Sequence, residues 1–363
     1  MFRMSFAALA AAVLVAGCGG GGGGDSALPQ PPVVVAPSGS LSLLAGAVAR
    51  TEFPECVVDG QGASARFQSI SGISTDKAGH VYVAELARCH APLVPFDTAP
   101  SSGINLVRKI DPTGLVATKA TVIRFSSFES MTASGAWTGL GAAQDGRVFV
   151  AQYSDGAAIL GPRLIGGVFR VDPDGAVTFK DLGEVALSDV AIASDGRVQT
   201  TSGTVDPVSL ELTRPPRAVD SLSGAPVGFS SIAFGADDVL YGASRTGVYR
   251  QSAPGVFTLL AGHSIQRGMV DAQGGEARFA DIKAGSLGVD SKGNVFVADN
   301  GHLVRKITPD GKVSTVAGQP GEDSTVELGE LPGKLTGVSG LAVGPDDSIY
   351  LNAQSAVLKL ALE

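Results

Sequence analysis

The sequence predicts an all-β fold, a six-bladed β-propeller made of four-stranded antiparallel blades. Three observations support this prediction: one stretch reads as a complete four-stranded meander, its first turn recurs six times along the 363 residues, and the two ends of the chain complete each other. Self-similarity that recurs along a chain is the signature of a repeat architecture, and here the copies differ in spacing because of loops of different length. The repeat is therefore stronger evidence for the fold class than the prediction of any single strand.

The clearest blade lies between Glu276 and Gly318. Its four expected strands are Gly285–Asp290, Val295–Asp299, Leu303–Ile307 and Val313–Val316. The turns that join them carry glycine, which adopts positive φ without a steric penalty, together with Ser, Asn, Asp or Pro, which favour tight turns. The stretch therefore predicts an antiparallel meander.

The turn between the first and second strands is the steadiest marker of the repeat. Most copies are followed by a β-branched or aromatic run with little polar alternation, which is typical of strands buried on both faces. The copies are Asp76–Gly79, Gln144–Gly146, Ser194–Gly196, Ala236–Asp238, Ser291–Gly293 and Pro345–Asp347. Six turns predict six blades.

The two ends of the chain predict how the ring closes. The last blade stops shortly after its third strand, Ala356–Leu360, and so lacks a fourth. The segment Leu41–Gly46 has no blade of its own and matches the fourth strands Phe257–Gly262 and Val313–Gly318. We therefore expect this N-terminal strand to complete the last blade, which removes an exposed sheet edge at each terminus.

The N-terminus predicts export from the cytoplasm. Arg3 precedes a short apolar segment, Ala7–Val15, which is typical of a signal peptide. Small residues immediately before Cys18 resemble the bacterial lipobox, and this resemblance implies lipidation of Cys18; a plain secretory signal is the alternative. We expect residues 1–17 to be the signal peptide, 18–38 a Gly/Pro-rich tether and 39–363 a single propeller. By resemblance to lipoprotein sorting, Gly19 favours the outer membrane, with the propeller either periplasmic or surface-exposed.

Composition and cysteine content agree with this predicted location in the cell envelope. The net charge of −8 argues against a nucleic-acid partner, since phosphate contacts need a clustered basic face. Beyond residue 17 no apolar run approaches the roughly 18–20 residues of a membrane span. With Cys18 acylated, Cys56 and Cys89 form an even pair in loops expected at the same end of the meander. We expect a disulfide between them, with two free thiols as the alternative.

Several motifs resemble the NHL repeat. They are Gly60–Phe67, Gly274–Phe279, Val81–Glu85, Val295–Asp299, Leu106–Ile110, Leu303–Ile307 and Val316–Gly318. The match is strongest in the first and fifth blades, although it extends over roughly residues 41 to 363. The resemblance implies a six-bladed β-propeller but not one function, because NHL relatives include protein-binding, RNA-binding and lyase propellers. Function must therefore be argued from the site.

The candidate catalytic residues are the carboxylates expected around the channel. The position that ends each second strand holds Glu85, Gln152, Ser202, Ala243, Asp299 and Ala353, so only two of six are acidic. The starts of the inner strands are small and hydroxylic, with Asp189 their one carboxylate. A bound Ca²⁺ needs about six oxygen ligands. Glu85, Asp189 and Asp299 supply only part of such a set, and the four histidines show no metal-ligand spacing. We therefore expect no metal and no other cofactor.

Two functions follow from these residues. The first is a lipid-anchored binding or scaffold module that recognises a protein or small molecule through long loops on a rigid ring. Its expected binding face includes Phe96, Trp137, Gln152, Asn300 and His302. Trp137 is either a stacking platform at the channel mouth or a packed residue between blades. The alternative is a metal-dependent hydrolase or lyase, similar to sugar-lactone hydrolases, that acts through Glu85, Asp189 and Asp299. The partial carboxylate set favours binding over catalysis.

Overall fold

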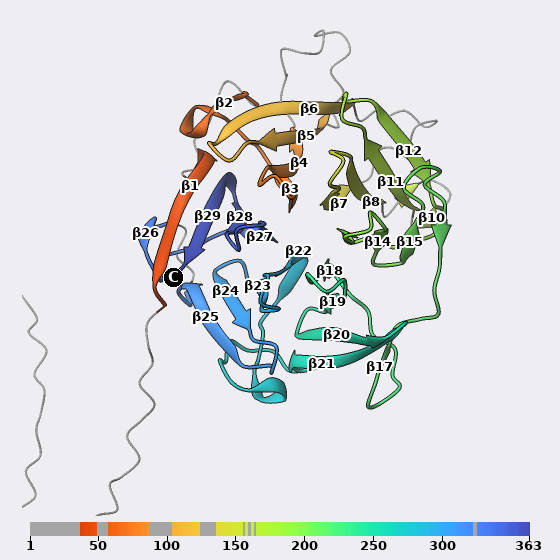
Figure 1. Cartoon of the computed structure of the whole chain (residues 1–363), viewed down its shortest axis with the longest axis vertical. Helices are drawn as coiled ribbons and strands as arrows, with labels where there is room; N and C mark the ends of the chain where they lie inside the picture. Colours follow the sequence, from red (N-terminus) through yellow and green to blue (C-terminus); the bar gives the residue numbers. More distant parts are fainter. Residues whose placement is uncertain are drawn as a thin grey trace, which may run out of the picture. The chain divides into compact units, whose positions relative to one another are not determined.

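The computed structural model describes residues 37–48, 57–87, 104–123, 136–154, 157–158, 161–162, 165–321 and 325–363. These residues form six sheets arranged radially around a central channel, as a six-bladed β-propeller (Figure 1). The predicted fold class and number of blades are confirmed. None of the helices in these ranges has the length and apolar character that a membrane span requires.

In the first three blades the main strands follow one another from the channel outward. Blade 1 contains β2 (Gly60–Gln61), β3 (Ile70–Thr75), β4 (Val81–Ala87), β5 (Ile104–Ile110) and β6 (Leu115–Ile123). Blade 2 contains β7 (Ala136–Ala142), β8 (Val148–Ser154), β11 (Ile165–Val171) and β12 (Val177–Asp181), and a separate hairpin pairs β9 (Ala157–Ala158) with β10 (Gly161–Pro162). Blade 3 has shorter strands: β13 (Val190–Ile192), β14 (Val198–Thr200), β15 (Gly203–Val205) and β16 (Leu212–Thr213).

The second half of the ring follows the same plan. Blade 4 contains β17 (Val219–Asp220), β18 (Ser231–Phe234), β19 (Leu240–Ala243), β20 (Gly247–Ala253) and β21 (Val256–Gly262), with β17 parallel to β21. Blade 5 contains β22 (Ile282–Val289), β23 (Val295–Asp299), β24 (Leu303–Ile307) and β25 (Val313–Gly318). Blade 6 contains β26 (Gly329–Glu330), β27 (Val338–Val343), β28 (Ile349–Ala353), β29 (Ser355–Leu362) and β1 (Gly39–Ala47). Short 3-10 turns, η1 (Gly62–Ser64) and η4 (Gly274–Glu276), lead into blades 1 and 5.

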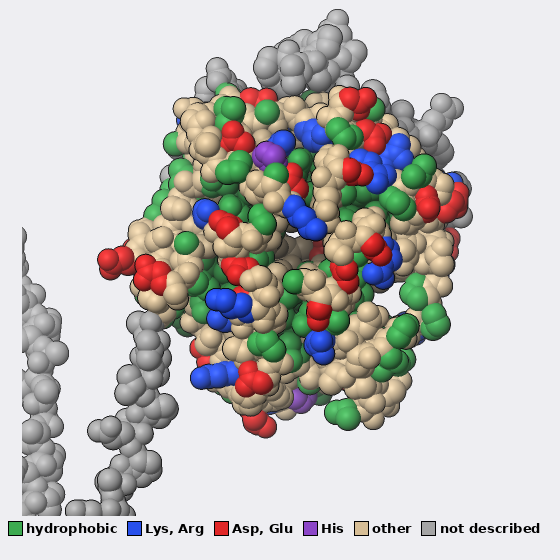
Figure 2. Space-filling view, in the orientation of Figure 1, with side chains coloured by type: hydrophobic (Ala, Val, Ile, Leu, Met, Phe, Trp, Pro, Cys, Tyr) green, Lys and Arg blue, Asp and Glu red, His purple; other side chains and the backbone are tan. Residues whose placement is uncertain are grey.

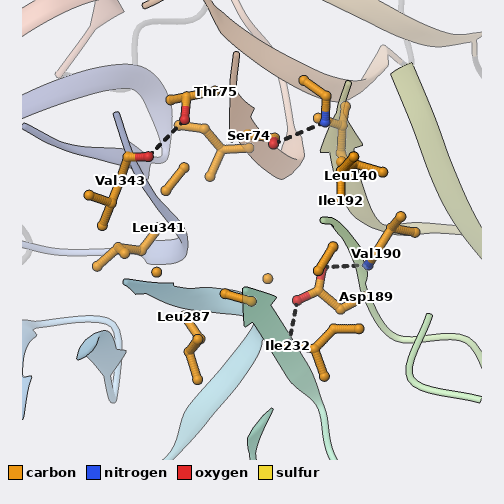
Figure 3. Close-up of a pocket in the computed structure, with 18 of the residues that line it drawn as sticks. Ser74, Thr75, Leu140, Asp189, Val190, Ile192, Ile232, Leu287, Leu341 and Val343 are labelled. Atoms are coloured by element: carbon orange, nitrogen blue, oxygen red, sulfur yellow. Dashed lines mark hydrogen bonds between the residues drawn. The ribbon is translucent and has the colours of Figure 1, made fainter. Parts of the chain in front are cut away.

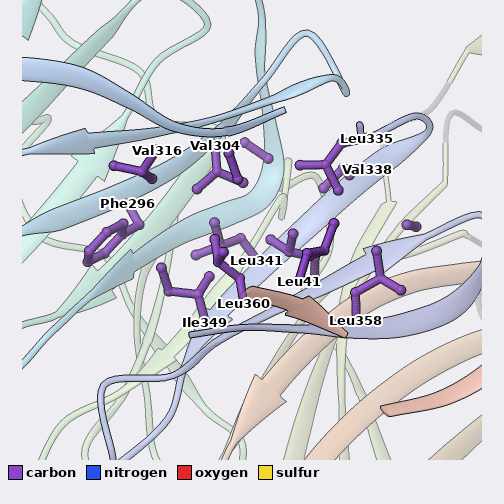
Figure 4. Close-up of a cluster of buried hydrophobic side chains, with 14 of the residues drawn as sticks. Leu41, Phe296, Val304, Val316, Leu335, Val338, Leu341, Ile349, Leu358 and Leu360 are labelled. Carbon is purple, nitrogen blue, oxygen red and sulfur yellow. The ribbon is translucent and has the colours of Figure 1, made fainter. Parts of the chain in front are cut away.

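Strand β1 closes the ring as the sequence predicts. It pairs along its length with β29, and Leu43 lies opposite Leu358. The side chain of Leu41 is only 1 % exposed and packs in a cluster with Leu335 and Leu360 (Figure 4). The outer edge of β1 is covered in turn by β26. The first strand of the propeller therefore locks the last blade, and neither end leaves a long unpaired edge.

The channel is lined by the innermost strand of each blade, namely β3, β7, β13, β18, β22 and β27. Hydroxyl groups on these strands form hydrogen bonds between neighbouring blades. Thr75 Oγ1 donates to the Val343 carbonyl at 2.8 Å, Thr138 Oγ1 donates to the Leu187 carbonyl at 2.9 Å, and Ser74 Oγ accepts from the Ala142 N–H at 3.1 Å. The small polar residues of the inner strands thus join the blades to one another.

One inner strand, β22, is longer than the sequence predicts. Its pairing with β23 begins at Ile282, opposite Asp299, rather than at Gly285. Four residues, Lys283–Ser286, then lie opposite the single residue Ala298 before pairing resumes at Leu287. Blade 1 places only Ser71 and Gly72 opposite the equivalent Ala84. Blade 5 therefore carries two extra residues in its innermost strand.

Candidate functional site

Glu85 lies in strand β4, two residues before its end at Ala87, and is completely buried. Its Oε2 accepts a hydrogen bond from Arg108 Nη1 on β5 at 2.9 Å, and its Oε1 accepts from the Gln68 N–H. The Arg108 guanidinium also donates to Asp59 and lies 5.0 Å from the centre of the Phe67 ring. Both carboxylate oxygens of Glu85 are therefore engaged, and its charge is balanced by a cation of the same blade.

Asp299 occupies the equivalent place at the end of β23 and is also completely buried. Its Oδ2 accepts from Arg305 Nη1 at 2.9 Å, while its Oδ1 accepts from the N–H groups of Ala280 and Asp281 at 2.8 and 2.9 Å. Arg305 also pairs with Asp271 at 2.7 Å and lies 5.3 Å from the centre of the Phe279 ring. Blades 1 and 5 thus contain the same network.

Burial dominates the titration of both carboxyls. It raises the pKa of Glu85 to about 7, although the charge of Arg108 and the hydrogen bond from Gln68 oppose the rise. It also raises the pKa of Asp299, against the hydrogen bond from Asp281 and the charge of Arg305. The two carboxylates belong to separate networks in separate blades, so the structure does not bring them together in one site.

The sequence analysis missed the two arginines that hold these carboxylates. Arg108 and Arg305 both stand in a Leu-Val-Arg-Lys-Ile run, and only the two blades with this run end their second strand in an acid. That coincidence was the available signal for an ion pair. Arg66 and Arg278, which precede the two phenylalanines, instead donate to nearby backbone carbonyls.

Asp189 precedes β13 and lies in the wall of the channel, with an exposed fraction of 4 % (Figure 3). Its Oδ1 accepts from the Val190 N–H at 2.8 Å, and its Oδ2 accepts from Ser231 Oγ at 2.8 Å and the Ile232 N–H at 3.0 Å. The N–H of Gly285 on β22 is a further donor. Burial raises the pKa of Asp189 to about 7, against these hydrogen bonds.

The two extra residues of β22 explain how Gly285 reaches Asp189 across the channel. Gly285 adopts φ +65°, a left-handed conformation that favours glycine. The atom nearest to the place of a Cβ on Gly285 is the carbonyl oxygen of Thr138, which belongs to blade 2 on the opposite side of the ring. The segment Lys283–Ser286 therefore crosses the channel at the end where the inner strands begin.

The other residues of the predicted binding face are separated in the structure. Trp137 is buried between blades 1 and 2 and lies 5.3 Å from the Phe169 ring, so it is a packed inter-blade residue, and Gln152 lies buried opposite it on β8. Asn300 is exposed with φ 53°, and the neighbouring His302 ring lies 3.1 Å from the Leu335 carbonyl. Phe96, Cys18, Cys56 and Cys89 lie outside the described residues.

The described part of the chain contains no group of three or more His, Cys, Asp or Glu side chains arranged to hold a metal ion. Of the three candidate carboxylates, Glu85 and Asp299 form ion pairs with arginines, and only Asp189 lines the channel. Chemically, this arrangement supplies one buried acid held by neutral donors. It can bind or exchange a proton or a cation.

These features define the protein as a six-bladed β-propeller with a channel carboxylate in blade 3. No protein-family model and no curated protein matches the chain. Among solved structures it is similar to a structural-genomics protein of unknown function from Bacteroides thetaiotaomicron, with 19 % identity over 89 % of this chain and 76 % of that one and a TM-score of 0.63. This likeness shows the fold.

Two further solved structures match the chain more weakly. A virginiamycin B lyase from Staphylococcus aureus is 13 % identical over 82 % of this chain and 96 % of its own, with a TM-score of 0.47. A gluconolactonase from Xanthomonas campestris is 13 % identical over 92 % of this chain and 99 % of its own, with a TM-score of 0.46. At this level of similarity neither activity transfers to the chain.

Proposed function

We propose that the protein is a lipid-anchored propeller of the cell envelope that binds a protein or small-molecule partner and is not itself an enzyme. The observation that carries this proposal is the use of Glu85 and Asp299 as internal counter-ions of Arg108 and Arg305. A buried carboxylate locked to a guanidinium is not available to bind a metal ion or to accept a substrate proton. Two of the three acids of the alternative hypothesis are therefore engaged in ion pairs, and only Asp189 remains without a counter-ion.

We define the loop face as the end of the ring where the second strands end and the inner strands begin. Recognition is proposed here because this face combines a rigid scaffold with polar groups in exposed positions. Arg245 and Lys283 share the carboxylate of Asp281, while their own side chains remain 60 % and 50 % exposed. Asn300, which directly follows β23 in blade 5, is also exposed. Such groups are suited to hydrogen bonding with a partner.

The cellular address remains part of the proposal. Lipidation at Cys18 and the tether 18–38 would hold the propeller near the outer membrane, and Cys56 and Cys89 would form a disulfide in that oxidising compartment. An NHL-type origin is supported by the shared network of blades 1 and 5, since the residues of the NHL-like motifs are those that build it.

Site-specific photo-crosslinking of the full-length protein in its native cells tests the binding face. We expect a crosslinker at position 300 to give a discrete adduct, and one at position 292, in the first turn of the same blade, to give none. Deletion of residues 88–103, which join β4 to β5 in the sequence, should abolish the adduct. An unchanged adduct after the deletion, or equal adducts at both positions, contradicts the proposal.

Calcium titration distinguishes the hydrolase or lyase alternative. If the protein is a binding module, calorimetry should show no stoichiometric Ca²⁺ binding to the full-length protein. Tight binding of one Ca²⁺ that is lost in Asp299→Ala would instead establish the metal-dependent reading and overturn ours.

A further inference from the structure

Three arginines differ from the others that the structure describes. Arg214, Arg217 and Arg267 are exposed and form no hydrogen bond, ion pair or ring contact. Every other arginine in the described residues forms at least one such contact. Over the face of the ring visible in Figure 2, basic and acidic side chains are interspersed, so charge there is mixed. The free guanidinium groups of the described residues therefore lie in two short segments of the chain.

Exposed apolar side chains lie in the same two segments. Among the exposed large apolar side chains of the described residues, Leu222 at 89 % and Ile265 at 80 % have the highest exposed fractions. Met269 and Val270 are exposed as well. Leu222 follows the first two of these arginines, and Arg267 stands between Ile265 and Met269. Each segment thus combines free arginine with an apolar side chain in solvent.

Strand β21 places the two segments along one stretch of the perimeter. β21 lies at the outside of the ring, and β17 lies on its outer side (Figure 1). The turn after β17 is held beside β21, because the Ser221 N–H donates to the Phe257 carbonyl at 2.8 Å. The second segment begins directly after β21 ends at Gly262. We call the two segments, residues 214–224 and 263–270, the blade-4 rim; the seven residues of β21 between them span roughly 23 Å.

The exposed apolar side chains of the blade-4 rim belong to hydrogen-bonded turns. Asp220 Oδ1 accepts from the Leu222 N–H at 3.1 Å, and His263 Nδ1 accepts from the Ile265 N–H at 3.2 Å. The turns therefore fix where the backbone of these two residues runs, with both side chains left in water. Large apolar groups that are exposed together mark a surface that another phase or molecule covers.

The acidic residues next to these arginines are already engaged. Asp220 accepts hydrogen bonds within its own turn, and Asp271, directly after the rim, is paired with Arg305 at 2.7 Å. Glu211, shortly before the rim, is paired with Lys180 at 2.6 Å. The blade-4 rim therefore presents uncompensated positive charge beside apolar side chains, although the chain as a whole carries a net charge of −8.

We propose that the blade-4 rim docks on the surface of an anionic lipid bilayer, with Leu222 and Ile265 inserted among the headgroups and the three arginines against lipid phosphates. A guanidinium matches the geometry of a phosphate with two parallel hydrogen bonds. Basic side chains near an anionic bilayer stabilise its binding, and apolar side chains beside them gain from burial at the headgroup boundary. The rim projects outward from the ring, so it suits a deformable surface that closes around it.

The rim contact goes beyond the proposed lipid anchor and does not depend on it. The chain from Cys18 to Gly39 can extend to at most roughly 75 Å. This reach is several times the radius of gyration of roughly 20 Å expected for a domain of this size. A lipid on Cys18 would therefore attach the ring without selecting which side meets the membrane. Docking through the rim selects that side, and it leaves the loop face accessible to a partner.

A fluorescent label on the full-length protein tests the proposal. An environment-sensitive label is attached at Ile265→Cys, and the protein is reconstituted with vesicles of phosphatidylcholine and phosphatidylglycerol. We expect its emission to rise several-fold and to be quenched by spin-labelled lipid. The matched control is a label at Val208→Cys in blade 3, where the native side chain is 71 % exposed, and its emission should not change. Co-sedimentation with neutral vesicles reports the anchor separately, so failure of the anchor and failure of the rim are distinguishable.

Charge dependence separates lipid docking from other occupants of the rim. Arg214→Gln/Arg217→Gln should lower the ratio of docked to undocked protein at least tenfold. Lys77→Gln/Lys292→Gln removes the same charge from exposed turns of blades 1 and 5 and should not lower it. Raising the ionic strength from 0.1 M to 1 M shortens the Debye length from about 10 Å to about 3 Å and should also weaken docking.

Four outcomes overturn the proposal. Equal emission changes at positions 265 and 208, an equal response on vesicles without phosphatidylglycerol, or a response that survives the double arginine variant each contradict docking on anionic lipid. A response that appears without vesicles and grows with protein concentration identifies a second copy of the chain as the occupant instead.

Discussion

Blades 1 and 5 contain the same buried network but differ in their innermost strands. In each, an arginine on the third strand pairs with a buried acid of the second strand and lies against a phenylalanine ring. In each, a glutamine amide also donates to a carbonyl of the outer turn: Gln61 to Thr113 and Gln273 to Asp310. Only blade 5 has two extra residues between the phenylalanine and the first turn.

The difference shows how a repeat tolerates an insertion. The Asp299 network fixes the position of Ile282, where β22 begins, and the turn after Val289 fixes the position where β22 ends. An insertion of two residues preserves the alternation of side chains, so Leu287–Val289 keep their faces. Because both ends of β22 are fixed, the two added residues displace the segment Lys283–Ser286 out of the sheet, and the segment extends into the channel. The network that the two blades share is structural, and the inserted segment of blade 5 is the departure that crosses the channel.

The largest expected effect is on the network itself. Arg305→Leu leaves Asp299 buried without its counter-ion, which should lower the free energy of unfolding by about 3–5 kcal/mol. Arg108→Leu should have the same effect in blade 1, because Glu85 is equally buried. Denaturant-induced unfolding measures both.

Blade 6 supplies the control for this prediction. It places Ala353 and Leu358 where blade 5 has Asp299 and Arg305, and both are completely buried. The double variant Asp299→Ala/Arg305→Leu copies that solution, so it should recover most of the stability lost in Arg305→Leu. If the single and double variants are equally unstable, the uncompensated charge is not the cause.

The comparison also shows what the sequence could predict. Turn chemistry repeats in every blade, so it predicted six blades, the closure by β1 and the bounds of β23 and β24 as found. The site was harder to predict, because the sequence pattern around a carboxylate at a strand end is the same whether its side chain faces solvent or an arginine. The partner of Glu85 lies 23 residues away on the next strand. The crossing of the channel by Gly285 was visible only as a difference in spacing: Phe279 lies eleven positions before Asp290, whereas Phe67 lies nine before Asp76.

The next effect concerns Asp189, a buried carboxylate without a counter-ion, although burial raises the pKa of the arginine-paired Glu85 to about 7 as well. Asp189 has its pKa raised from 3.8 to about 7, so between about pH 4 and pH 7 the native state binds more protons than the unfolded state. The free energy of unfolding therefore falls as pH rises through this window, by at most roughly 1.4 kcal/mol per pH unit from this group. Asp189→Asn should reduce the dependence measured by urea unfolding at pH 4.5, 5.5, 6.5 and 7.5 without removing it, because the pKa of Glu85 is raised to about 7 as well. Parallel curves for the two proteins would rule out Asp189 as the source.

The smallest effect concerns the backbone of the crossing segment and its counterpart in blade 1. Gly285 has φ +65° with no atom closer than 3.9 Å to an added Cβ, so Gly285→Ala should lose about 1–2 kcal/mol from backbone strain alone. Asparagine tolerates this conformation better, and Gly285→Asn should lose less than Gly285→Ala. Gly72 in blade 1 has the opposite character, because it lacks a positive φ but its added Cβ would lie 3.3 Å from Leu140 Cβ. Gly72→Asn should therefore be worse than Gly72→Ala. Thermal unfolding of the four variants measures which substitution is worse at each position. Opposite orders at Gly285 and Gly72 separate backbone strain in the inserted segment from crowding in the regular strand. The same order at both positions would show that β22 does not cross the channel in this conformation.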